Sequence, residues 1–484
     1  MFFEENLEEN LYNMCRKIIR NNNEKCLGKD VDPNIVEKIS EFPIEGIGIN
    51  KLCEEIVNDL VPYCTNFHNP SFMGFPDSGN SSAGVIGGVA SELLQQNIIN
   101  ATFCAPIATY IEIFVINWFR KLIGYSVSES VKTVEEIGGI VTYGGTMSNA
   151  VAMLLARINK KPETYVKGID SSDDLWVIVP EDLGHYSICA SLCWTGCGNK
   201  TIEVPTKKFR YDIDMLKNII MENKSKIMGI VLYAGDSRTM TIEDISTVYH
   251  VIKKCDENIW VHVDACNGFC LAFSDKLRYK LNGIELCDSV SLDPHKMMML
   301  PYTASILLVK NPDMMSKLRT KSDLIMNDNL SFGQITPFIG SKAWISLKIW
   351  CVMRSYGKKG LQRVMDERYE LAQYLKERIN QTENTLLLND VDAFAVVFLF
   401  YPDNAFLDDD KINIINKKIY ERITNEKKYY IHQFPLTIEH QGTKKIIYPL
   451  RFFSGNSFLT KKKIDAMLVD ICEKGKNIYE NNLY

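Results

Sequence analysis

Residues 260–265 read WVHVDA, and residues 289–296 read SVSLDPHK. Each stretch is a short uncharged run that ends in charged residues, which predicts strands at 259–263 and 289–292 that are buried on both faces of a sheet. The flanking chain repeats the pattern, with further strands predicted at 175–179, 229–233 and 304–309 and helices at 148–158, 212–224 and 241–255. This alternation indicates an α/β unit around a mainly parallel sheet.

Outside this unit the pattern changes. Residues 1–60 are expected to be helical and partly acidic, and to form an arm that packs on another subunit or domain. Beyond residue 344 we expect two charged helices reaching 379, a strand at 393–400, a helix, strands at 429–433 and 446–453, and a helix at 460–479. The predicted organisation is an N-terminal helical segment at 1–80, a large α/β domain at 81–345 and a small α+β domain at 346–484.

The amino-acid composition limits the classes of partner that the protein is expected to bind. The 484 residues carry 55 Lys and Arg against 60 Asp and Glu, so the net charge of -5 gives no field to hold nucleic acid or an anionic membrane. No run approaches the roughly 20 apolar residues of a membrane span. The first ten residues contain four glutamates and no basic residue, which argues against a targeting peptide. We therefore expect a cytoplasmic protein that acts on a small molecule.

Four possible metal ligands recur every four residues: His185, Cys189, Cys193 and Cys197. On one helix they would span about 18 Å, far more than a single tetrahedral zinc site allows. We therefore expect no metal site here, and interpret the cysteines as small apolar thiols on a buried helix face.

The chemistry is predicted at one edge of the sheet. Parallel strands present their carboxyl ends together, so Asp264 and Lys296 should meet there. A lysine amine bonds to the aldehyde of pyridoxal 5'-phosphate (PLP), and a carboxylate keeps the ring nitrogen of PLP protonated. The segment Gly144-Gly145-Thr146-Met147-Ser148-Asn149 precedes a predicted helix, whose N-terminus can hold a phosphate. Together these features predict a PLP site.

The same residues resemble the motifs of the group II PLP-dependent decarboxylases, most closely the glutamate and cysteine sulfinate decarboxylase branch. The matching motifs are His262-Val263-Asp264-Ala265, Asp293-Pro294-His295-Lys296 with Pro301, and Gly144-Gly145-Thr146 with Ser148-Asn149. The resemblance covers about residues 60–480. It implies a type I PLP-dependent (aspartate aminotransferase-like) α/β fold, with a mainly parallel seven-stranded sheet, a smaller α+β domain, and a homodimer with its active site at the interface.

The resemblance also implies roles for single residues. Lys296 is similar to the lysine that holds the cofactor, Asp264 to the partner of the ring nitrogen, and His185 to the histidine that stacks on the ring. Arg451 is similar to the arginine that binds the substrate's α-carboxylate, so Lys296, His185 and Arg451 are the expected catalytic residues. The other expected cofactor contacts are Thr146, Met147, Ser148, Ala265 and His295.

Departures from the family's pattern mark the expected substrate pocket. Asp236 stands where the family has a hydroxyl residue, and Phe75 and Asp77 replace polar residues that hold the side-chain carboxylate in the glutamate branch. Asp77 would repel a second carboxylate, which argues against glutamate. The family's mobile loop carries a tyrosine that returns a proton to the substrate, whereas the loop at 321–339 has none and offers Phe332.

We therefore expect a PLP-dependent decarboxylase that converts an L-amino acid, not glutamate, to its amine and carbon dioxide. One alternative is decarboxylation coupled to oxidative deamination, which yields an aldehyde. Another, of a different class, is a catalytically silent PLP-binding subunit that regulates a true decarboxylase.

Overall fold

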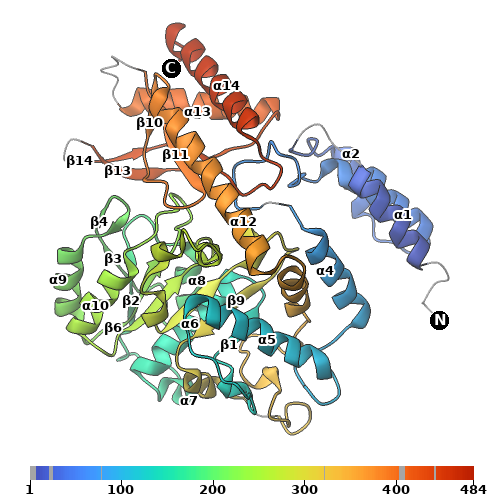
Figure 1. Cartoon of the computed structure of the whole chain (residues 1–484), viewed down its shortest axis with the longest axis vertical. Helices are drawn as coiled ribbons and strands as arrows, with labels where there is room; N and C mark the ends of the chain where they lie inside the picture. The colour runs from blue at the N-terminus through green and yellow to red at the C-terminus, as the bar shows by residue number, and fades with distance from the viewer. Residues whose placement is uncertain (1–6, 21–25, 78, 321, 403–408, 441–442) are drawn as a thin grey trace.

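The computed structural model describes residues 7–20, 26–77, 79–320, 322–402, 409–440 and 443–484. Its centre is a seven-stranded sheet in the order β1-β9-β8-β7-β6-β2-β3 (Figure 1). The strands are β1 (Gly139–Thr142), β2 (Trp176–Pro180), β3 (Thr201–Val204), β6 (Ile227–Tyr233), β7 (Trp260–Asp264), β8 (Ser289–Leu292) and β9 (Ser305–Val309). Only β9 is antiparallel to its neighbours in this sheet. The expected mainly parallel α/β fold is confirmed.

Burial explains why the strand prediction worked. Every residue of β6, β7, β8 and β9 is buried, so both faces of these strands are covered by other parts of the fold. Helices α5 (Pro106–Ile123) and α6 (Gly145–Lys160) pack against the sheet, and α9 (Ile213–Asn223) and α10 (Ile245–Cys255) lie against each other beyond it. The helix expected to start at 241 starts four residues later. Asp244 caps it by accepting a hydrogen bond from the Thr247 N–H, and Thr241 belongs to the preceding turn.

A second, four-stranded antiparallel sheet lies beyond the first, in the order β10-β11-β15-β12. Its strands are β10 (Thr385–Leu387), β11 (Ala395–Phe400), β12 (His432–Gln433) and β15 (Leu450–Phe453), and the helices with it are α12 (Ser346–Gln381), α13 (Asp409–Glu426) and α14 (Lys461–Glu480). The two charged helices expected up to 379 are the halves of α12, which bends at Gly357 (φ 60°). The strand expected at 446–453 is divided, because its first residues belong to the hairpin β13 (Leu436–His440) and β14 (Thr443–Ile447).

The N-terminal helices stand apart from both sheets. Helices α1 (Leu7–Arg20), α2 (Pro33–Ser40) and α3 (Ile49–Glu55) contain no buried residue, and α1 and α2 project from the side of the molecule (Figure 1). Large apolar side chains on this segment, such as Ile19 and Phe42, are about four-fifths exposed. Within the described residues, no helix is both long and apolar enough to cross a membrane.

The expected buried stripe of cysteines is wrong in part. Helix α8 (Tyr186–Trp194) ends three residues before Cys197, so Cys197 does not share a helix face with the others. Cys193 is exposed and Cys189 is half-buried. The helix ends after Trp194 because Gly196 adopts a φ of 84°, and the N–H groups of Gly196 and Cys197 then bond to the carbonyl oxygens of Cys193 and Leu192.

Candidate active site

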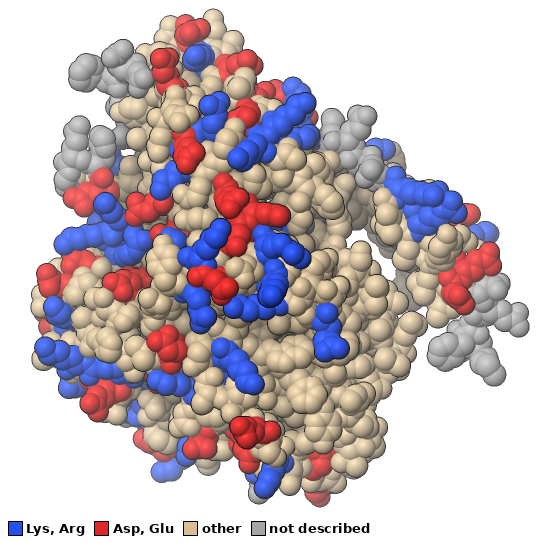
Figure 2. Space-filling view, viewed as in Figure 1, with Lys and Arg blue, Asp and Glu red and all other residues tan. Residues whose placement is uncertain are grey.

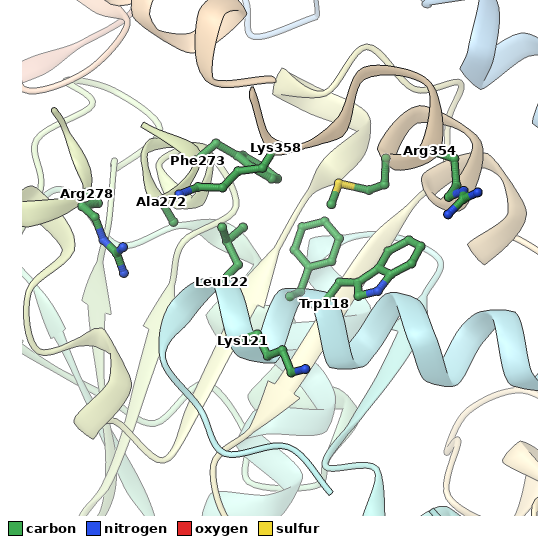
Figure 3. Close-up of a pocket in the computed structure, with 10 residues that line it drawn as sticks. Trp118, Lys121, Leu122, Ala272, Phe273, Arg278, Arg354 and Lys358 are labelled. Atoms are coloured by element: carbon green, nitrogen blue, oxygen red, sulfur yellow. The ribbon is translucent and has the colours of Figure 1, made fainter. Parts of the chain in front are cut away.

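A cavity of about 440 Å³ opens at the carboxyl ends of β6, β7 and β8. It gathers most of the residues selected from the sequence: Lys296, Asp264, His185, Thr146, His295, Arg451, Phe75 and Asp77. A second cavity, of about 480 Å³, lies between α5 and α12 (Figure 3). Of the described residues, four basic and six apolar ones line that second cavity, and no carboxylate or histidine is among them. It therefore offers no acid–base pair, whereas the first cavity does.

Lys296 follows β8 on the short helix α11 (Pro294–Met297), and its Nζ lies 3.1 Å from Asp293 Oδ2. Burial of the ammonium would lower the pKa of Lys296, but the carboxylates of Asp293 and Asp264 outweigh it and hold the pKa above its usual value. The lysine is therefore kept charged and directed into the cavity.

Asp264 is the last residue of β7. Its Oδ1 accepts a hydrogen bond from the Cys266 N–H (3.1 Å), and its Oδ2 accepts one from Asn149 Nδ2 (2.9 Å). Burial alone would raise its pKa, but the charge of Lys296 and the Asn149 hydrogen bond outweigh burial and lower it. Asp264 is therefore an ionised carboxylate at neutral pH.

His185 is the N-cap residue of α8. Its Nδ1 lies 2.7 Å from Ser187 Oγ, and its backbone N–H donates to the Tyr233 hydroxyl (2.8 Å). Burial lowers the pKa of His185 below its usual value, despite the nearby Asp264. The imidazole is therefore neutral and fixed at one ring nitrogen.

A glycine turn forms the floor of the cavity where α6 begins. Gly144 has a φ of +137°, and a Cβ on Gly145 would come within 2.8 Å of Asp293 Oδ2 and Cys266 Sγ. Only glycine fits this approach of backbone to side chain. Thr146 lines the cavity, whereas Met147 does not, and the buried Ser148 hydroxyl lies 2.7 Å from that of Thr142.

Arg451 reaches the cavity from β15 of the second sheet. Its guanidinium donates to the carbonyl oxygens of Ser237 and Gly74, and it lies 5.2 Å from the Phe75 ring. Among the described residues it makes no ion pair, and its buried Nε has no hydrogen-bond partner. Burial lowers its pKa to about 10, so the charge persists at neutral pH.

Asp77 also lines the cavity, and its buried Oδ1 has no hydrogen-bond donor within the part of the chain that is described. Burial raises its pKa, although His295 and Lys296 act in the other direction. Such an oxygen is suited to an N–H donor from a ligand.

Besides Met147 and Ser148, three further expected site residues do not line the cavity. The Asp236 carboxylate turns back into its own loop, where it accepts hydrogen bonds from the N–H groups of Arg238, Thr239 and Thr241, so the expectation that it faces the pocket is wrong for this chain. Phe332 is fully buried in the core beside Lys342, outside the cavity of its own chain. Ala265 is buried behind Asp264, and its N–H donates to the Ser291 carbonyl.

Several residues that line the cavity were not selected from the sequence, Tyr302 and Asn149 among them. The ring of Tyr302 lies 4.8 Å from that of His295, and Tyr302 is 56% exposed at the cavity wall. Its position, six residues after Lys296 and directly after Pro301, was the available signal. Asn149 also lines the cavity, although in the sequence it is one polar residue among several at a helix start.

Comparison with known proteins agrees with this geometry. The model of the pyridoxal-dependent decarboxylase conserved domain matches residues 34–401. A phenylacetaldehyde synthase of Petunia hybrida is 25% identical over 422 residues, covering 83% of this chain and 81% of that protein. The cysteine sulfinic acid decarboxylase of Mus musculus is 24% identical over 388 residues, covering 77% of this chain and 75% of its own.

Among solved structures, that of Oryza sativa TDC with PLP and tryptamine superposes with a TM-score of 0.85. The superposition covers 98% of this chain and 99% of the rice chain. At 18% sequence identity this likeness shows the shared fold alone.

Proposed function

The chain belongs to the pyridoxal-dependent decarboxylase family and is a PLP-dependent amino acid decarboxylase, and on that basis we propose that its substrate is an L-amino acid with an apolar or cationic side chain. The relatives act on different amino acids, as their names state, so family membership leaves the side chain open. The observation that supports the choice is the unpartnered Oδ1 of Asp77 in the cavity wall.

The residues present fit PLP. Lys296 and the ionised Asp264 line one cavity, so the lysine, once its nitrogen has given up a proton, can bond to the aldehyde while the carboxylate meets the ring nitrogen. A Cβ on Gly144 would meet no atom within 4 Å, so the backbone where α6 begins is open to a phosphate. When bound, PLP withdraws electrons from the substrate's α-carbon and so allows carbon dioxide to leave.

The protein's own groups then have separate tasks. Lys296 would hold the cofactor and Asp264 its ring nitrogen, while His185 would lie against the ring. Arg451 carries a buried charge without a carboxylate partner among the described residues, so it is suited to binding the α-carboxylate and orienting it for departure. Met147 and Ser148 would act through the backbone of the α6 turn, with Thr146 at the cavity wall.

Asp77 would select the side chain. A substrate ammonium or N–H group can satisfy its free oxygen, whereas a substrate carboxylate would meet a second carboxyl in a half-buried site. Phe75, whose ring lies 4.5 Å from that of His432, adds an apolar wall. Glutamate and cysteine sulfinate should therefore be poor substrates.

The alternative product is an aldehyde. The loop at 321–339 contains no tyrosine, and a phenylacetaldehyde synthase is among the relatives. A site without an acid near the α-carbon leaves that carbon open to oxygen. We propose the amine as the main product with an aldehyde side product, because His185 and Tyr302 remain in the cavity as proton donors.

We also propose that the enzyme is a homodimer with its active sites near the interface. The face of α4 (Ser82–Leu94) and α5 exposes Ile86, Leu93, Ile107, Tyr110 and Phe114. Figure 2 shows few charged side chains over these helices. A second copy would cover this face and give the helices at 1–80 an apolar surface to pack on. We also place domain boundaries near residues 80 and 345 in this proposal. A cytoplasmic location, which would keep the fourteen cysteines as thiols, is part of it too.

The test is a substrate panel. Purified protein with PLP is incubated with each common L-amino acid, and carbon dioxide, amine, aldehyde and peroxide are measured together. The proposal expects release of carbon dioxide from an apolar or cationic amino acid, mostly as amine. Fastest turnover of glutamate or cysteine sulfinate would contradict the proposed selectivity.

A further inference from the structure

A line of buried polar side chains runs beneath the cavity, between β7, β8 and α6. Trp260, His262 and Asp264 share one face of β7, because alternate residues of a strand point to the same side. Ser289 of β8 pairs in register with His262, and Asn149 of α6 contacts that strand face. His262 and Ser289 are fully buried, and Asn149 is 1% exposed.

Along this line of side chains, the donor and the acceptor of each hydrogen bond can be assigned in turn. Trp260 Nε1 can only donate, and it donates to Ser289 Oγ (2.8 Å). The Ser289 hydroxyl is then free to donate to His262 Nδ1 (2.8 Å), which leaves the His262 proton on Nε2. Nε2 donates to Asn149 Oδ1 (3.0 Å). The amide of Asn149 is thereby oriented with its two N–H bonds toward the cavity.

The two N–H groups of the Asn149 amide bond to two different residues at the cavity. One donates to Asp264 Oδ2 (2.9 Å) and the other to Ser187 Oγ (2.8 Å). Because Ser187 Oγ accepts from Asn149, its own proton can go to His185 Nδ1 (2.7 Å), which also accepts from the Ser187 N–H (3.3 Å). His185 then carries its proton on Nε2.

We propose that Asn149 and His262 are positioning residues, which hold Asp264 as an ionised acceptor and His185 as the Nε2–H tautomer. Asp264 and His185 would then each face PLP in a single protonation state. This inference rests on the proposed roles of Asp264 and His185 toward PLP. It assigns to Asn149 a link between the two groups that would contact the cofactor.

The Asn149 amide cannot be turned the other way round, because its oxygen would then face another hydrogen-bond acceptor. A flipped Asn149 would direct Oδ1 at Asp264 Oδ2, and two acceptors 2.9 Å apart repel each other. A protonated His262 is also excluded near neutral pH, because burial lowers the pKa of His262 to about 4. Neutral His262 and the Trp260 donor therefore fix the network.

The first test replaces Asn149 by aspartate, which has the same shape but presents a second carboxylate to Asp264. Equilibrium dialysis of PLP against the full chain should show affinity at least tenfold weaker than wild type at pH 8, the effect of losing one hydrogen bond to a charged group. The affinity of Asn149→Asp should recover as the pH falls, because one of the facing carboxylates then takes up a proton. A role in packing alone would not produce that pH dependence.

Asn416→Asp is the matched control. Asn416 is fully buried on α13 and bonds the Phe400 backbone, far from the cavity lining. This variant should lose thermal stability but keep the wild-type PLP affinity per folded molecule. Equal loss of PLP affinity in both variants would overturn the proposal.

A second pair of variants keeps the question open to test if Asn149→Asp does not fold. In His262→Gln the side-chain amide can still donate to Asn149 Oδ1, whereas His262→Leu fills similar space without a donor. PLP affinity should stay within about threefold of wild type in the first and fall about tenfold or more in the second. Equal affinities in the two variants would refute the proposal, while failure of the wild type to bind PLP would refute the proposed function itself.

Discussion

Replacing Asp77 by asparagine should relieve the selection against acidic substrates. At about 4 Å and an effective dielectric constant of about 20, two carboxylates repel by about 4 kcal/mol. Asp77 is only half-buried, so solvent screening reduces this to roughly 2 kcal/mol, which is about a 30-fold change in rate. Asp77→Asn should therefore raise kcat/KM for glutamate, relative to the best apolar substrate, by about 30-fold.

The assay measures both kcat/KM values by carbon dioxide release between pH 6 and pH 8. Because burial raises the pKa of Asp77, a fall in pH should protonate it and reduce the discrimination against glutamate in the wild type but not in Asp77→Asn. Glu181→Gln is the control, since it removes a carboxylate that pairs with Lys444 and does not line the cavity. An unchanged substrate ratio in Asp77→Asn, or an equal change in Glu181→Gln, would refute the reasoning.

Further outcomes are expected. Lys296→Ala should lose the visible absorption of lysine-bound PLP and all turnover, and a borohydride-stable link between protein and cofactor in that variant would argue against it. Sedimentation of the wild type should give a species of twice 55.3 kDa, and a fully active monomer would disprove the dimer. Tyr302→Phe should raise the aldehyde fraction severalfold if that phenol helps return the proton, which paired amine and aldehyde assays will show. Burial raises the pKa of Glu243 to about 7, so the folded state holds its proton more tightly than the unfolded state. Below pH 4.5 this adds about 3 kcal/mol to the free energy of unfolding, and the stabilisation should be lost as the pH rises from 4.5 to 7. The stability of Glu243→Leu, measured by urea unfolding, should lack that pH dependence.

The sequence predicted the parts of the fold that depend on local patterns. β8 was predicted at its observed bounds, because a short buried strand between turns leaves a clear apolar run. The hairpin β13–β14 was missed because its strand β14 is mostly exposed and carries lysines, which weakens any alternating pattern. The start of α10 was misplaced because Asp236, several residues earlier, binds the Thr241 N–H.

The residues of the candidate site that could be predicted are those that lie in a recognisable sequence motif. Asp264 and Lys296 each follow a buried strand directly, so sheet geometry alone brings them to one edge. Asp236 and Phe332 were expected in the pocket, yet loop hydrogen bonds and core packing turn them away, and neither effect is visible in one sequence. The link through Asn149 depends on residues more than 100 positions apart, which only the folded chain brings together.

PLP-dependent decarboxylation in the cavity around Lys296 requires that this lysine bond to the cofactor. The most direct measurement is borohydride reduction of the PLP-loaded protein, followed by peptide mapping of the pyridoxyl group. We expect a single labelled peptide that contains Lys296, and protection of that lysine when substrate is added before reduction. Labelling of a different lysine, or no label in protein that releases carbon dioxide from an amino acid, would contradict it.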